Sequence, residues 1–203
     1  MIEPGLAAFL RPEFPLHTAR LLLRPFEDGD LEALYEMQRD PAVARYLYWE
    51  ARSLDEVRVQ LERIKPMTRI DEESDSLRLA AVLREGGALV GDYSLRLESR
   101  EHRQGEIGFI THPAHQGHGY ATEGSLVLLR LGFEVLGLHR IFGSCDARNV
   151  GSARVMERLG MRREAHFRHS EIFKGEWGDE LIFAMLEDEW RDRGHPAPVA
   201  PMA

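Results

Sequence analysis

The stretch Gln116-Gly117-His118-Gly119-Tyr120-Ala121, here called the glycine turn, constrains this chain more than any other segment. It lies between a strand-like run at 105–111 and a helix-like run at 122–136. A turn of this kind presents free backbone N–H groups at the positive end of the helix dipole. Glycine allows positive φ angles there and lets the backbone approach a ligand closely. The turn therefore predicts a strand–turn–helix unit with a site for an anion such as phosphate.

The order of the expected strands and helices along the chain predicts an α/β fold with a mixed, mostly antiparallel central sheet and helices on both of its faces. The unit at 106–145 is expected to be a right-handed crossover between two parallel strands. We expect helices at about 28–39, 53–65, 122–136 and 149–159, and strands at about 21–24, 77–83, 88–97, 106–111, 139–145, 161–169 and 179–186.

Length and composition favour a soluble single-domain protein. The 203 residues fit one domain at 1–190, with a core at about 20–190 and a flexible tail at 191–203. No apolar run is long enough to span a membrane, the first residues do not resemble a signal peptide, and there is a single cysteine. These features favour a cytoplasmic protein with no membrane partner. The net charge of −8 argues against nucleic-acid binding and is compatible with a cationic substrate such as an amine.

Two nucleotide-binding motifs do not fit the glycine turn. A Walker P-loop ends in Gly-Lys-Ser/Thr, and the sequence contains no such ending. A Rossmann fingerprint needs three glycines near the start of a βαβ unit, whereas the turn reads Gly117-x-Gly119-x-Ala121 after three antiparallel-looking strands. Both of these readings are therefore rejected.

The glycine turn fits the pattern Gln/Arg-x-x-Gly-x-Gly/Ala, as Gln116-x-x-Gly119-x-Ala121. It resembles the acetyl-CoA pyrophosphate loop of the GNAT superfamily of N-acetyltransferases, over about residues 20–190. The flanking segments are similar to the RimJ/RimL branch, whose acceptors are ribosomal-protein N-termini. The resemblance implies a single GNAT-like domain with a parallel strand pair around the acetyl-CoA loop. The matching segments are Glu106-Ile107-Gly108-Phe109, Gly119-Tyr120-Ala121-Thr122-Glu123, Asn149-x-x-Ser152, Leu159-Gly160-Met161, Gly175-x-Trp177-x-Asp179-Glu180 and Glu189-Trp190.

The resemblance implies an acetyl-CoA site made largely of main chain. Asn149 would cap the following helix and also contact the donor. The pantetheine arm would lie like an added strand beside 109–111, where a backbone N–H would polarise the thioester carbonyl. The structural alternatives are a turn whose glycines only relieve strain, a plain core strand at 109–111, and a simple N-cap at Asn149. The residues implied are Phe109, Ile110, Thr111, Gln116, Gly117, His118, Gly119, Tyr120, Ala121, Asn149 and Ser152.

Glu106 is the candidate general base, because an ammonium group must lose a proton before it can attack the thioester. Strand alternation places it on one face with Gly108 and Ile110, where partial burial would raise its pKa. The resemblance places Ser152 near the donor sulfur, where its hydroxyl would protonate the leaving thiolate. Many members of the superfamily carry a tyrosine on this helix, and 149–160 contains none. The alternatives are that Glu106 is a paired or solvated strand carboxylate and that Ser152 is an ordinary helix serine.

The three histidines His112, His115 and His118 suggest a metal site at first sight. Their spacing works on a helix, but Pro113 and Gly117 predict a loop, and no carboxylate or cysteine joins them. We therefore expect no metal.

Three further features have both a structural and a functional interpretation. Cys145 is expected to be a small buried hydrophobe, since direct attack by an amine needs no enzyme nucleophile. In the family, the segment 45–49 borders the acceptor groove, and its aromatic residues form either the groove wall or part of the core. The acidic loop 71–75 either attracts a cationic acceptor or is simply solvated.

The sequence thus predicts an acetyl-CoA-dependent N-acetyltransferase in which a primary amine attacks the thioester directly. The acceptor is a protein N-terminal amine or a small-molecule amine such as an aminoglycoside or amino acid. The alternatives are a non-catalytic acyl-CoA-binding or sensing module and, third, a purely structural α/β domain. The sequence does not identify the acceptor or the oligomeric state, and a homodimer is one possible assembly.

Overall fold

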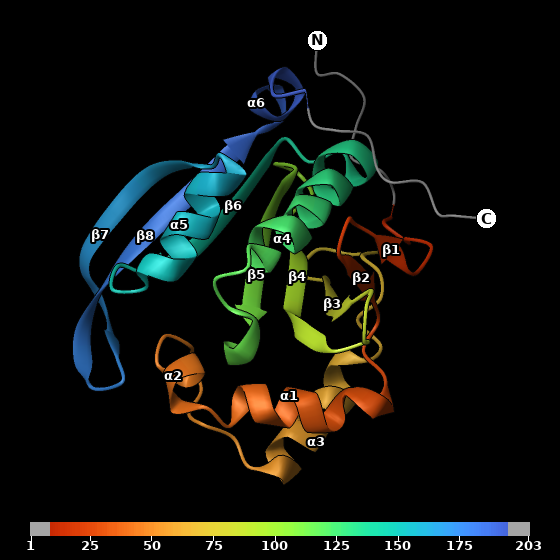
Figure 1. The fold of residues 1–203 in the computed structure, drawn as a ribbon. Coiled ribbons are helices and arrows are strands. Elements are labelled where there is room, and N and C mark those ends of the chain that lie inside the picture. Colours follow the sequence, from red (N-terminus) through yellow and green to blue (C-terminus); the bar gives the residue numbers. More distant parts are fainter. Residues whose placement is uncertain (1–8, 195–203) are drawn as a thin grey trace.

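The computed structural model describes residues 9–194, which form one eight-stranded sheet in the order β1-β2-β3-β4-β5-β6-β8-β7 (Figure 1). The strands are β1 (Leu16–His17), β2 (Leu21–Arg24), β3 (Ser76–Leu83), β4 (Leu89–Ser99), β5 (Gln104–Thr111), β6 (Arg140–Asp146), β7 (Arg162–Phe173) and β8 (Glu176–Leu186). The α-helices are α1 (Leu31–Gln38), α2 (Pro41–Ala44), α3 (Leu54–Ile64), α4 (Tyr120–Arg130), α5 (Val150–Leu159) and α6 (Glu187–Asp192). None of the helices within 9–194 is long and apolar enough to cross a bilayer.

Alternating apolar residues along β3 form two cores, one on each face of the sheet. Leu77, Leu79 and Ala81 belong to the larger core, which includes the buried side of α4. Ala80 and Val82 belong to the smaller core, which is completed by α1 and α3. Helix α5 contacts α4 and β6 and so lies beside α4 (Figure 1). The prediction of a mixed sheet with helices on both faces is confirmed.

The sheet has one parallel pair, β5 with β6, and this pair opens partway along its length. Gln104, Gly105 and Glu106 pair with Arg140, Ile141 and Phe142. Beyond this point β5 continues along β4 as far as Thr111, while β6 follows β8. The half of β5 that leads into the glycine turn therefore has a free edge on its β6 side. This is the splayed strand end that the resemblance implied.

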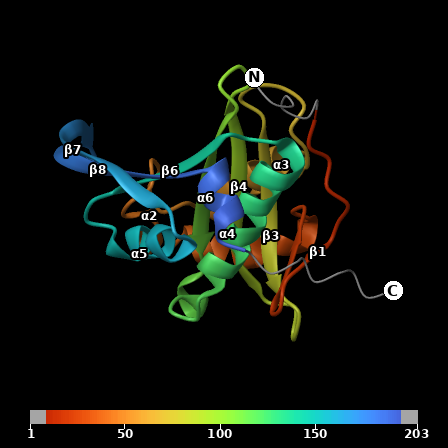
Figure 2. The same cartoon turned by 90° about the horizontal axis from the view of Figure 1, so that it is seen from above.

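The β7–β8 hairpin is longer than the sequence predicted. The expected strands at 161–169 and 179–186 extend to Phe173 and back to Glu176, and the hairpin projects to one side of the molecule (Figure 2). Most of its outer part is exposed, with Ile172 at 65% and Trp177 at 59%, and only Phe173 and Gly178 are buried there. A regular apolar alternation that would predict the full strands is therefore missing. The turn uses positive φ angles at Lys174 and Gly175.

Other boundaries shift by smaller amounts. The helix expected at 122–136 divides into α4 and a wider π-helical segment, Leu131–Leu136, which ends at Gly137 with φ 76° as expected. The short elements β1 and α2 were not predicted. Helix α6 extends into the expected flexible tail at 191–203, and residues 195–203 lie outside the described part of the chain.

Candidate active site

The glycine turn connects β5 to α4 through two left-handed residues. Gly117 has φ 80° and Gly119, the N-cap of α4, has φ 81°. A Cβ at Gly117 would meet no atom within 4 Å, so the backbone angle alone requires glycine there. The first N–H groups of α4 have no partner within the helix. They emerge from the turn at the positive end of the helix dipole, as an anion site requires.

Arg20, which the sequence did not single out, holds the glycine turn in place. Its Nη1 donates to the carbonyl of His118 at 2.9 Å, and its Nε donates to Glu123 Oε2 at 2.7 Å. The same guanidinium lies 4.6 Å from the centre of the Tyr120 ring. From the other side, Gln116 Nε2 donates to the carbonyl of Thr111 at 3.2 Å. The side chains around the turn thus fix its backbone, and the N–H groups of 117–121 have no acceptor within the described part of the chain, whereas that of Gln116 donates to Pro113 O.

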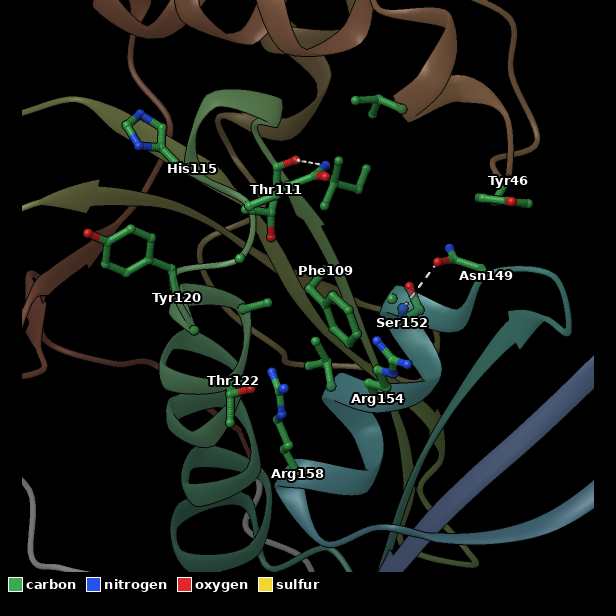
Figure 3. Close-up of a pocket in the computed structure, with 18 of the residues that line it drawn as sticks. Tyr46, Phe109, Thr111, His115, Tyr120, Thr122, Asn149, Ser152, Arg154 and Arg158 are labelled. Atoms are coloured by element: carbon green, nitrogen blue, oxygen red, sulfur yellow. Dashed lines mark hydrogen bonds between the residues drawn. The ribbon is translucent and has the colours of Figure 1, made fainter.

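A cavity of about 470 Å³ lies between the glycine turn, α4 and α5 (Figure 3). It contains all the expected donor-binding residues except His118, whose ring stacks on Tyr120 at 5.7 Å. The expected residues that line this donor cavity are Phe109, Ile110, Thr111, Gln116, Gly117, Gly119, Tyr120, Ala121, Asn149 and Ser152.

Two arginines of α5, Arg154 and Arg158, also line the donor cavity and were missed in the sequence (Figure 3). Both side chains are exposed, and neither makes an ion pair with another part of the described chain. Their spacing of four residues places them on one face of the helix that begins at Asn149, which is the signal that could have revealed them. They add positive charge opposite the glycine turn.

The open edge of β5 offers backbone groups from alternate residues. His112 N donates to Val90 O on β4, so strand alternation directs the main chain of Ile110 toward β4 as well. The N–H and C=O groups of Phe109 and Thr111 consequently face the open β6 side. Ile110 contributes its side chain instead, which lines the cavity.

A second cavity of about 330 Å³, here called the acceptor-side cavity, adjoins the first. Glu106 lies in its wall, as do Tyr48 and Trp49 from the segment 45–49, which places that segment at a groove. Six residues line both cavities, so the two spaces meet at the opening of the strand pair. The shared residues are Tyr46, Leu47, Phe109, Ile110, Asn149 and Ser152.

Glu106 has the environment expected of a base. Its side chain is partly buried, and its carboxylate accepts no hydrogen bond from the described residues. Burial raises its pKa, the charges of Glu98 and Glu180 raise it further, and Arg96 opposes them. A carboxylate of this kind takes up a proton at a higher pH than a solvated one, which suits acid–base chemistry.

Asn149 and Ser152 occupy the boundary between the two cavities. Asn149 Oδ1 accepts a hydrogen bond from the N–H of Ser152 at 3.1 Å, which confirms the predicted N-cap of α5. The Ser152 hydroxyl has no partner within the described chain and is free to face a ligand. Tyr46 approaches the same boundary from the segment after α2 (Figure 3).

The other candidate residues fall outside any reactive arrangement. Within residues 9–194 no cluster of histidine, cysteine and carboxylate side chains could hold a metal, and 113–115 is a short 3-10 turn. Cys145 is partly buried, and burial followed by the charges of Asp146 and Glu180 raises its pKa to about 11. A thiol with that pKa is a poor nucleophile. In the acidic loop, Asp71 pairs with Arg11 and Arg69.

Comparison with known proteins agrees with this geometry. Residues 20–162 match the model of the acetyltransferase (GNAT) domain. The uncharacterized N-acetyltransferase YnaD of Bacillus subtilis is 35% identical over 173 residues, which is 85% of this chain and 97% of the relative.

Solved structures show the same fold. A GNAT-family acetyltransferase from Bacillus anthracis superposes with a TM-score of 0.77 at 32% identity, covering 86% of this chain and 99% of that one. Spermidine N-acetyltransferase from Vibrio cholerae, solved with CoA and spermine, has a TM-score of 0.71 at 23% identity, over 86% and 99% of the two chains. The chain belongs to the GNAT acetyltransferase family and is an N-acetyltransferase.

Proposed function

We propose that this N-acetyltransferase takes its acetyl group from acetyl-CoA and transfers it to a primary amine by direct attack. The observation that carries the proposal is the meeting of two cavities at the open β5–β6 edge. One cavity has the anion-binding glycine turn, and the other has a partly buried carboxylate. A thioester at their boundary would face both.

The donor cavity suits the chemistry of CoA. Phosphate oxygens need N–H donors and positive charge, which the glycine turn, Arg154 and Arg158 supply. The pantetheine arm carries amides, which pair with main-chain groups as an added strand does. The free edge at Phe109 and Thr111 offers such groups, and an N–H there would stabilise the oxyanion.

The reaction then requires three proton transfers and no covalent enzyme intermediate. Glu106 accepts the first proton of the ammonium group, directly or through water, and frees the nitrogen lone pair. The nitrogen attacks the thioester carbonyl, so a C–N bond forms, and the attacking nitrogen then loses its surplus proton to solvent. The C–S bond breaks when the tetrahedral intermediate collapses. The Ser152 hydroxyl protonates the leaving thiolate and recovers a proton from solvent. The products are the acetylated amine and CoA.

The flanking motifs favour the RimJ/RimL-like branch, so a peptide N-terminus and a small-molecule amine are both acceptors to test. We propose a cytoplasmic location and a homodimer as the working assembly. The second candidate function is a CoA-binding module without activity, which is favoured by the lack of a tyrosine on α5.

The test combines donor binding with turnover. Calorimetry is expected to show binding of acetyl-CoA below high-micromolar concentration, and absence of binding would contradict both CoA-based functions. Release of CoA thiol against a panel of amines and peptides, with mass detection of the product, then separates enzyme from sensor. Binding without acetylation of any amine would favour the sensor.

A further inference from the structure

Three arginines line the acceptor-side cavity together with Glu106. Arg78 comes from β3, Arg52 from the segment before α3, and Arg63 from α3 itself. The side chains reach the cavity from three separate parts of the chain. The amides of Gln38 and Gln60 lie in the same wall.

One of these cations is neutralised by the protein. Arg78 Nε donates to Asp92 Oδ1 at 2.9 Å, and the Asp92 carboxylate is almost fully buried at 1% exposure. A fork-like pair of this kind leaves little net charge for a ligand. Arg78 and Asp92 therefore form a fixed polar wall.

Within the described part of the chain, Arg52 and Arg63 form no ion pair with a carboxylate, although the charges of Glu56 and Asp92 act on Arg52. Arg52 donates to the neutral amide oxygen of Gln38 at 2.6 Å and stacks 4.4 Å from the centre of the Trp49 ring. The nearby Glu56 carboxylate accepts hydrogen bonds from the N–H and hydroxyl of Ser53, in the capping box that begins α3. The exposed Arg63 makes no hydrogen bond or ion pair within residues 9–194.

Burial and neighbouring charges act on Arg52 in opposite directions. Loss of hydration and repulsion from Arg63 and Arg78 lower its pKa, and the charges of Glu56 and Asp92 oppose this without outweighing it. An anion placed between these side chains would relieve that repulsion.

The three arginines and Glu106 come from different sides of the acceptor-side cavity. The charges that act on Glu106 are Glu98, Arg96 and Glu180, and none is one of these arginines. Strand β3, which carries Arg78, is separated from β5 by β4, which corresponds to about 10 Å across the sheet. The wall of the cavity thus carries a carboxylate from β5 and arginines from β3 and the α3 region.

We propose that the acceptor is a primary amine that carries a carboxylate several bonds from its nitrogen, and that Arg52 and Arg63 bind this carboxylate. The inference rests on the proposed function, since it concerns the acceptor of the same reaction. An amine with a second positive charge, as in a polyamine, would place that charge against two arginines that form no ion pair within residues 9–194. The carboxylate belongs either to a free amino acid or to an acidic side chain near a peptide N-terminus, which share this chemistry.

The test uses acceptors that differ only in the distal group. Aminohexanoate, hexylamine and diaminohexane have the same chain and end in a negative, neutral or positive group. A peptide set, Gly-Glu-amide, Gly-Gln-amide and Gly-Lys-amide, tests the second source of the carboxylate. In at least one of the two sets, we expect kcat/KM for the carboxylate acceptor to be about ten times that for the neutral acceptor, or higher.

Variants assign the effect to the two arginines. Arg52→Gln and Arg63→Gln are expected to raise KM for the carboxylate acceptor about tenfold and to leave the neutral acceptor unchanged. Arg63→Glu, at an exposed position, should shift the preference toward the positively charged acceptor. Arg58→Gln removes the same charge from the same helix, at a residue that lines neither cavity, and should change nothing.

Binding to the CoA-loaded protein, measured by calorimetry, separates this inference from the proposed function. If the protein acetylates no amine, the proposed function is overturned. Tighter binding of aminohexanoate or Gly-Glu-amide than of their neutral and positive counterparts would still support the carboxylate site. Equal or stronger binding or turnover of the neutral or positive members in both sets would overturn the inference. Variants that leave the ratios of the wild type unchanged would also overturn it.

Discussion

Replacement of Glu123 by alanine tests whether the first turn of α4 is anchored by the β1–β2 region. Glu123 Oε1 accepts hydrogen bonds from the Thr18 hydroxyl at 2.7 Å and the Arg20 N–H at 2.8 Å. Its Oε2 accepts from Arg20 Nε at 2.7 Å. The carboxylate is largely buried, with 16% of the side chain exposed, whereas the Arg20 side chain is 48% exposed.

These contacts set the expected loss of stability. A hydrogen bond to a charged group contributes about 1.5 kcal/mol at the lower end of its range, and Thr18 and the Arg20 N–H each make one. The half-exposed guanidinium adds at most about 1 kcal/mol after solvent screening. Thr18 can also donate to Leu21 O at 3.2 Å, which limits its loss. We expect Glu123→Ala to lower the free energy of unfolding by about 3 kcal/mol, or Tm by about 6 to 12 °C.

Thermal and denaturant unfolding measure this change, with Glu36→Ala as the matched control. Glu36 forms an exposed pair with Arg39 at 3.1 Å, so its loss should cost about 0.5 kcal/mol or less. Because Arg20 also holds the His118 carbonyl, Glu123→Ala should weaken acetyl-CoA binding as well. A loss of stability below about 1 kcal/mol would refute this account of the anchor.

The pH dependence gives an independent check on Glu123. Burial raises its pKa, but the hydrogen bonds from Thr18 and Arg20 outweigh burial and lower it overall. A lowered folded-state pKa gives stability that is present above the unfolded value, about 4.3, and is lost as the pH falls through the folded value. The stability difference between wild type and Glu123→Gln should therefore be constant near neutral pH and shrink in acid. A difference that persists at low pH would contradict the electrostatic part of the account.

Three further predictions concern the reaction. Glu106→Gln should lower kcat by about 10²- to 10⁴-fold with acetyl-CoA affinity intact. Because burial raises the pKa of Glu106, the wild-type rate should begin to fall in acid at a pH above the ordinary pKa range of a glutamate. If Glu106→Gln has the same pH–rate profile as the wild type, Glu106 is not the base. Gly119→Val forces a β-branched residue to φ 81° and should abolish acetyl-CoA binding with an unchanged circular dichroism spectrum; surviving binding would contradict the turn's role. Arg154→Gln and Arg158→Gln should each raise the Kd of acetyl-CoA several-fold and reduce its salt dependence, and unchanged affinity in both would remove them from the donor site.

The features that the sequence predicted well depend on local backbone chemistry. Gly137 and Gly160 end helices in the left-handed conformation, and Asn149 caps α5, as their types and positions indicate. Ser53 and Glu56 form a capping box at the start of α3, as a serine followed three residues later by a glutamate indicates. These outcomes follow from sterics and hydrogen bonds within a few residues, so no knowledge of the remaining chain was needed.

The extent of the β7–β8 hairpin was not predictable in the same way. Apart from the buried Phe173 and Gly178, its outer part is mostly exposed and has no regular apolar alternation, so local sequence does not indicate its length. The hairpin is nevertheless connected to the rest of the fold, since Tyr48 donates to Glu171 at 2.7 Å and Lys174 donates to the carbonyl groups of Ala44 and Trp49. These contacts join residues more than a hundred positions apart.

The sequence by itself therefore determined the fold class, the glycine turn and the resemblance that indicated the donor, because each depends on contiguous residues. The tertiary structure alone decided which distant side chains surround that turn and which line the second cavity. Arg20 reaches the turn from the β1–β2 region, and Arg52, Arg63 and Arg78 meet in one cavity although they come from different elements. The interaction energy of a charged side chain with a ligand depends on the distance between them. That distance is set by tertiary packing rather than by the order of residues in the sequence.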